Sequence, residues 1–117
     1  MSDFYKLNDD HSTEPCSMEE FGHLMQNLRE NDRKHVVKET YLGHFISTVF
    51  LGLNHNFDGS GSPLLFETMI FHPDSKWNEL YADRYSTWEE AKEGHELAKK
   101  WLKQHLNDEV SKVKEPE

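Results

Sequence analysis

Two helix-start signals enclose a β-rich segment in this chain, and that order restricts the fold more than any other feature. One begins at Ser17 and the other at Thr87, and each has a glutamate three residues later. In such a capping box the hydroxyl accepts from the glutamate's amide while the carboxylate reaches back. Apolar residues follow both boxes at helical spacing, which predicts helices over about 17–31 and 87–106.

The segment between these helices is rich in β-branched and aromatic residues, which favour strands. The pattern predicts strands at about 35–41, 44–53 and 64–71, a loop through Trp77, and a short edge strand at 80–85. We therefore expect an α+β fold, in which an antiparallel meander of three or four strands has both helices packed on one face. The other face would carry apolar residues, so we expect a homodimer.

The two ends of the chain differ from its middle. Residues 1–16 are polar without a periodic pattern, and 107–117 are highly charged. We expect a flexible lead-in, a single domain over 17–106 and a charged C-terminal tail. The sequence has no apolar run of the roughly 20 residues that span a bilayer, and its N-terminus lacks the features of a secretory signal. The single cysteine, Cys16, fits a reducing compartment, so we expect a cytoplasmic protein without a membrane partner.

The charge balance disfavours nucleic acid as a partner. There are 22 acidic and 13 basic residues, and the formal net charge is −9. The topology resembles a double-stranded-RNA-binding domain, but such domains place basic residues where the last helix begins. Here Glu89 and Glu90 stand at that point and would repel phosphate. The acidity is interpreted as a source of solubility, or as mimicry of nucleic acid in a basic groove; the mixing of acids with lysine and arginine favours solubility.

No motif for catalysis or metal binding is complete. The segment 54–65 matches the first positions of a calcium-binding EF-hand loop, but Leu65 stands where a bidentate glutamate is required. It therefore indicates a turn between strands. The eight histidines show no specific metal-ligand spacing, and no nucleophile or phosphate-binding motif is present. We expect no metal, no cofactor and no catalytic residue.

Two polar residues occupy unexpected positions. Glu67 shares a strand face with Met69 and Phe71, where a carboxylate needs a partner. It is either paired with Arg84 or a lysine, or it is an acid that contacts a ligand. His95 lies on the apolar stripe of the second helix, as a hydrogen-bonded core residue or a ligand contact. We predict that Glu67 and His95 are neighbours in a groove beside the hairpin. The other candidate ligand-binding residues are Thr48, His55, Thr68, Arg84 and Tyr85.

Three stretches of the sequence resemble a known family. They are STVFLGLNHNF at 47–57, LLFETMIF at 64–71, and RYSTWEEA with the following GH at 84–95. These are similar to segments of small uncharacterised proteins from tailed-phage and prophage genomes. The family usually has Asp-His where this chain has Asn54-His55, which weakens any metal or acid role for position 54. The resemblance implies a phage accessory protein in the cytoplasm of a bacterial host, and it implies no reaction.

Three classes of function are compatible with these features. The first is a non-enzymatic accessory protein that binds a host protein or a small nucleotide-like ligand, and so counters host defence or redirects host metabolism. The second is a small metal-dependent hydrolase that uses His55, Glu67 and His95. The third is a structural or assembly component of the virion.

Overall fold

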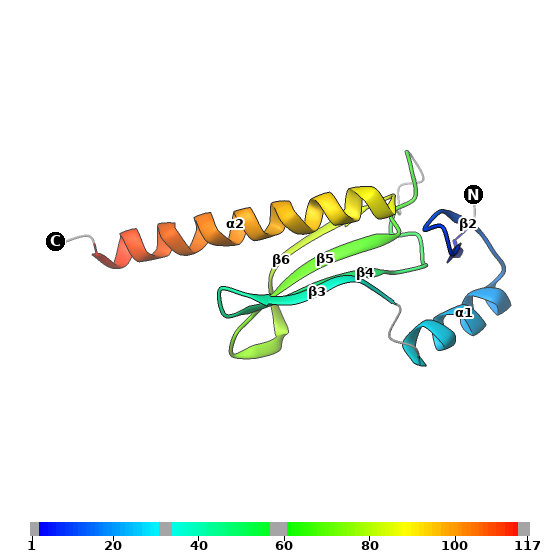
Figure 1. Cartoon of the computed structure of the whole chain (residues 1–117), viewed down its shortest axis with the longest axis horizontal. Coiled ribbons are helices and arrows are strands. Elements are labelled where there is room, and N and C mark those ends of the chain that lie inside the picture. Colours follow the sequence, from blue (N-terminus) through cyan, green and yellow to red (C-terminus); the bar gives the residue numbers. More distant parts are fainter. Residues whose placement is uncertain (1–2, 31–33, 57–60, 115–117) are drawn as a thin grey trace.

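The computed structural model describes residues 3–30, 34–56 and 61–114. It confirms the α+β class, with four antiparallel strands in the order β3-β4-β5-β6 and a separate two-stranded sheet (Figure 1). One helix precedes the four-stranded sheet and the other follows it. The elements are β1 (Tyr5–Leu7), β2 (Thr13–Pro15), α1 (Met18–Glu30), β3 (His35–Tyr41), β4 (His44–Phe50), β5 (Phe66–His72), β6 (Ser75–Tyr85) and α2 (Trp88–Lys114).

The register of the two central strands sorts their side chains onto two faces. Ile46 pairs with Ile70, and Thr48 pairs with Thr68. All four are fully buried. Because successive side chains in a strand point to opposite faces, these residues face α2, and their immediate neighbours in sequence face away from it. The sheet thus has one covered face and one open face.

The long helix α2 covers the sheet and contacts all four of its strands (Figure 1). Its fully buried residues recur at helical spacing: Ala91, His95, Ala98 and Leu102. The helix continues to Lys114 instead of ending near 106, because the charged segment after 106 contains no helix breaker. Both capping boxes form as predicted, since the amides of Glu20 and Glu90 each lie 3.1 Å from the expected hydroxyl. Neither described helix has an apolar stretch sufficient to span a bilayer.

The N-terminal segment corrects the prediction of a lead-in without regular structure. Strands β1 and β2 form an antiparallel hairpin, and Tyr5 of β1 is buried in the core. The Tyr5 amide donates to the Gly52 carbonyl at 2.8 Å, which attaches the hairpin to the segment after β4. Each strand has only three residues, too few for an alternating pattern to be visible in the sequence. The domain therefore begins earlier than residue 17.

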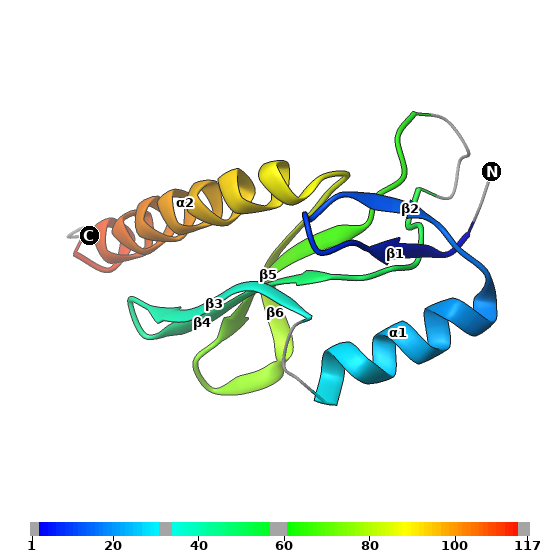
Figure 2. The ribbon, with the colours of Figure 1, turned by 45° about the vertical axis from the view of Figure 1, so that its right-hand side comes forward.

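Helix α1 reaches the core beside this hairpin. Its contacts are with β1, and its buried Met25 and Leu28 belong to the same apolar cluster as Phe50 and Phe66. Figure 2 shows the hairpin between α1 and the start of α2. The buried residues of α1 and of the start of α2 share one apolar cluster, those farther along α2 belong to a second, and only α2 lies along the sheet.

The last strand is longer than predicted. β6 spans Ser75–Tyr85, whereas the sequence pattern indicated a loop through Trp77 and a strand from 80. Its pairing with β5 shifts register on either side of Phe71. Such bulges interrupt the alternation from which a strand is recognised, and this explains why the first half of β6 was missed.

Candidate functional site

A line of buried polar side chains runs between the sheet and α2. The hydroxyl oxygens of Thr48 and Thr68 lie 2.5 Å apart, and the Thr48 hydroxyl lies 2.7 Å from Nδ1 of His95. All three side chains are fully buried. Buried polar groups are costly unless they have partners, and here the direct pairing of Thr48 with Thr68 presents both hydroxyls to the helix. The arrangement satisfies the imidazole inside an otherwise apolar core.

The other edge of the imidazole connects this line to the surface. Nε2 of His95 lies 2.7 Å from a carboxylate oxygen of Glu39, whose side chain is 31% exposed. Lys99 Nζ lies 3.3 Å from the second oxygen of that carboxylate. The hydrogen bond from His95, with a smaller contribution from Lys99, lowers the pKa of Glu39 below its ordinary value of 4.5. The Glu39 carboxylate therefore accepts from Nε2–H.

For the tautomer of His95 that carries its proton on Nε2, these contacts give one consistent direction of hydrogen bonding. With Nε2 donating to Glu39, a neutral His95 accepts at Nδ1 from the Thr48 hydroxyl. Thr48 must then accept from the Thr68 hydroxyl. The network thus orders its protons from Thr68 towards Glu39, and we refer to Thr68, Thr48, His95 and Glu39 as the buried relay.

Tyr85 lies beside the buried relay without joining it. Its hydroxyl is buried and has no hydrogen-bond partner among the described residues. Burial raises the pKa of Tyr85 to about 12. The Thr68 hydroxyl is near enough to oppose that rise, but not in hydrogen-bond geometry. Packing of the ring against the core, and not a hydrogen bond from the hydroxyl, therefore explains the position of Tyr85.

Tyr85→Phe is expected to leave the free energy of unfolding unchanged or to raise it by about 1 kcal/mol, because it removes a buried donor that has no partner. Urea unfolding followed by circular dichroism measures the change. A loss of more than about 1 kcal/mol would show that the hydroxyl makes a hydrogen bond in solution.

The structure brings together four of the predicted site residues: Thr48, Thr68, Tyr85 and His95. It separates the other three, Glu67, Arg84 and His55, from them. Glu67 precedes Thr68 in β5 and so points to the open face, where Arg84 Nε donates to its carboxylate at 2.9 Å. The pairing of Glu67 with Arg84 is confirmed as one of the two interpretations. The predicted contact between Glu67 and His95 is wrong, because the sheet lies between them.

His55 also lies apart from the buried relay, in the loop after β4. Its Nδ1 is 2.7 Å from the Leu53 carbonyl oxygen. The neighbouring Asn54 is buried, and its side-chain oxygen accepts from the amides of Asn56 and Leu64 at 2.8 and 3.1 Å. The polar residues of this loop thus hold its own backbone, as a turn does; positions 57–60 lie outside the described residues. The three residues suggested for a hydrolase are not gathered into one site.

Sequence reasoning missed Glu39 and Lys99. Glu39 lies between Val37 and Tyr41 on one face of β3, so the same alternation that drew attention to Glu67 marks it too. Glu39, His95 and Glu96 also place three possible metal-ligand atoms within 4.8 Å of one another. The Lys99 ammonium lies 3.3 Å from Glu39 and 3.7 Å from Glu96. This lysine already provides the positive charge that the two carboxylates require.

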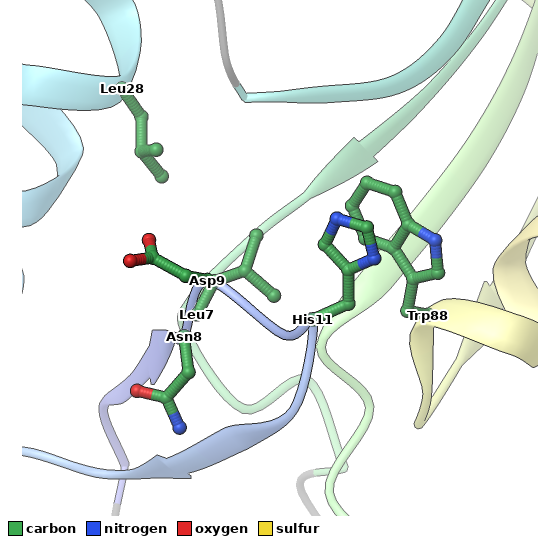
Figure 3. Close-up of a pocket in the computed structure, with 6 residues that line it drawn as sticks. All are labelled: Leu7, Asn8, Asp9, His11, Leu28 and Trp88. Atoms are coloured by element: carbon green, nitrogen blue, oxygen red, sulfur yellow. The ribbon is translucent and has the colours of Figure 1, made fainter.

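A surface cavity of about 200 Å³ lies elsewhere, at the turn of the N-terminal hairpin. The His11 ring covers one face of Trp88 there, with centroids 3.7 Å apart and planes 10° from parallel (Figure 3). Leu7 and Leu28 also line it. None of the predicted site residues contributes to this cavity, so it provides no support for their common role.

No protein-family model, curated protein or solved structure matches the sequence. The class of the molecule is therefore defined by its own geometry: an α+β domain with an internal polar relay and exposed apolar surfaces.

Proposed function

We propose that the chain is a non-enzymatic binding protein that contacts another protein through α2. The observation that carries this proposal is an aromatic cluster on the exposed side of the helix. Trp101 lies between Tyr81 and His105, with ring centroids 5.0 and 4.8 Å away. Leu97 is one turn earlier on the same helix. We call these four residues the helix patch.

The helix patch has the properties of a protein-binding surface. Leu97 is 59% exposed and Trp101 is 37% exposed, although Trp101 stands at helical spacing from the buried Ala98. The stacked ring of His105 and the tilted ring of Tyr81 restrict the indole, so little side-chain freedom remains to be lost on binding. Tryptophan and tyrosine are also enriched among the residues that dominate binding energy. A partner with an apolar pocket fits this surface.

The burial of the polar relay supports binding over catalysis. Thr48, Thr68 and His95 have no exposed surface, and each is a partner of another member of the relay. A general base or nucleophile must come within hydrogen-bond reach of its substrate. The relay is therefore better explained as the polar part of the core than as a reaction centre.

Charge indicates the kind of partner. At a net charge of −9, the chain as a whole attracts basic surfaces at long range and repels acidic ones. α2 carries six acidic and six basic residues (6 − 6 = 0), so this attraction steers the approach of a partner from outside the helix. The resemblance to phage proteins makes a bacterial host protein the first partner to seek, with host defence or metabolism as the process affected. A nucleotide is less well supported, because the sheet separates Arg84 from the buried Thr48 and His95. A virion component would instead be found in purified particles by mass spectrometry.

A photo-crosslinking amino acid at position 97, in protein expressed in a bacterial host, tests the proposal. The control carries the same group at Met18, which is 69% exposed at the start of α1. We expect a protein that is crosslinked from position 97 and not from 18. The purified pair should then bind with a Kd that rises at least about tenfold on Trp101→Ala and rises with salt. Identical crosslinks from both positions, or full affinity of the Trp101→Ala variant, would contradict the proposal.

A further inference from the structure

The four-stranded sheet has a second face, on which no described helix packs (Figure 1). Apolar side chains occupy its two central strands. Phe45 is 39% exposed, and its ring stacks on Phe71 with centroids 6.1 Å apart. Val49 and Met69 extend the apolar area. We call these four residues, with Ser47 between them, the open face.

We propose that the open face binds the same face of a second copy of this chain, forming a two-fold dimer. This goes beyond the proposed function, which uses the helix patch on the other side of the sheet. The dimer would present two helix patches to a partner.

Charge favours a second copy over a basic protein at this face. The register places Lys38 and Arg84, and also Glu67 and Glu79, at positions around the open face, so their charges cancel (2 − 2 = 0). The net charge of −9 consequently belongs to the rest of the chain. A basic partner is attracted to that remaining surface. Two copies can approach each other through the open face without bringing excess negative charge together.

The open face is also complementary to itself. Residues paired across β4, β5 and β6 form three rows on this face. The middle row contains Ser47 and Met69, one outer row ends at Arg84, and the other outer row ends at Glu79. We place a two-fold axis between the two facing sheets, parallel to the middle row and perpendicular to the strands. The rotation then brings each outer row of one copy over the other outer row of the second copy. This sets Arg84 opposite Glu79 of the second copy, and Val49 opposite Phe45 of the second copy. It also sets Glu67 opposite Phe71, and brings Lys38 of the edge strand β3 over its own copy, so the complementary charges are those of β6.

Arg84 has the donors for this contact. Only its Nε–H is used within the described chain, in the bond to Glu67, and the side chain is 43% exposed. A guanidinium has five N–H donors. The remaining donors can reach the Glu79 carboxylate of the second copy, and arginine is enriched among the residues that dominate binding energy.

Sedimentation equilibrium of the full chain tests the proposal. We expect a mass of twice 13.8 kDa at micromolar concentration. Phe45→Asp and Ser47→Arg should each raise the dimer Kd by at least about tenfold. Ser47→Arg removes no apolar contact, so it remains informative if Phe45→Asp unfolds the chain. Leu97→Asp is the control, because it places the same charge at an exposed apolar residue of the helix patch, away from the open face, and should leave the dimer intact.

The response to salt separates this inference from the proposed function. The open face carries no net charge, so the dimer Kd should change less than about threefold from low to high salt. Binding of a basic partner at the helix patch should weaken over the same range. A mass of 13.8 kDa throughout, or equal dissociation by Leu97→Asp and Phe45→Asp, would overturn the dimer and leave the partner-binding proposal standing.

Discussion

Gly94→Ala is expected to lower the free energy of unfolding by about 3 kcal/mol, because the added Cβ would overlap the ring of Tyr85. The direction is the reverse of the usual one, since alanine normally stabilises a helix interior by about 1 kcal/mol over glycine. The Tyr85 ring is held in the core and cannot move aside freely. The prediction therefore tests how closely α2 approaches β6, on which the position of the buried relay depends.

Gly22→Ala provides the control within the same chain. Gly22 is a helical residue of α1, and a Cβ there would have no atom within 4 Å. It is expected to raise the free energy of unfolding by about 0.5–1 kcal/mol. Urea unfolding followed by circular dichroism measures both variants. If Gly94→Ala stabilised the protein as Gly22→Ala does, the close contact of α2 with Tyr85 would be refuted.

His95→Leu is expected to cost about 3 kcal/mol of unfolding free energy. The leucine fills a similar volume but removes the imidazole, so that the buried Thr48 hydroxyl keeps only Thr68 and the Glu39 carboxylate keeps only Lys99 as a partner. His23→Leu, at an exposed position of α1, is the control and should change stability by less than about 0.5 kcal/mol. Equal stability of the two variants in thermal and urea unfolding would contradict the role assigned to the buried relay.

The acid dependence of stability tests the ionic end of the same relay. The folded pKa of Glu39 is lowered, chiefly by the hydrogen bond from His95. Its stabilising contribution is therefore complete above its ordinary pKa of 4.5 and is lost as pH falls through the lower folded value. The stability difference between the unmodified chain and Glu39→Gln should shrink over that acidic range. A difference that stays constant with pH would show that the carboxylate has no ionic partner.

The sequence reveals the fold where elements are long and regular. The capping boxes at Ser17 and Thr87 locate both helix starts, and the alternation in β4 and β5 locates the central strands. The hairpin in 1–16 cannot be predicted from the sequence pattern, because its strands are too short to show an alternation of apolar and polar residues. The end of α2 was predicted too early, because charged helix-forming residues continue the helix beyond its apolar stripe.

The candidate site was predictable only in part, for a related reason. Alternation assigns Thr68 and Glu67 to opposite faces, and helical spacing places His95 on the buried stripe. Neither pattern says which strand supplies the partner of His95. That partner, Glu39, is 56 residues away in sequence, and its contact depends on the order and register of β3 and β4. The sequence therefore identified most of the polar residues and misassigned one pair.

Native mass spectrometry of the protein purified from a bacterial host tests the central claim, that the chain acts through protein contacts. We expect species at 13.8 kDa and at twice that mass, and a further species that contains a second protein. The masses should match polypeptide alone, with no small molecule retained. A metal ion or nucleotide held in stoichiometric amount by the folded chain would contradict the account.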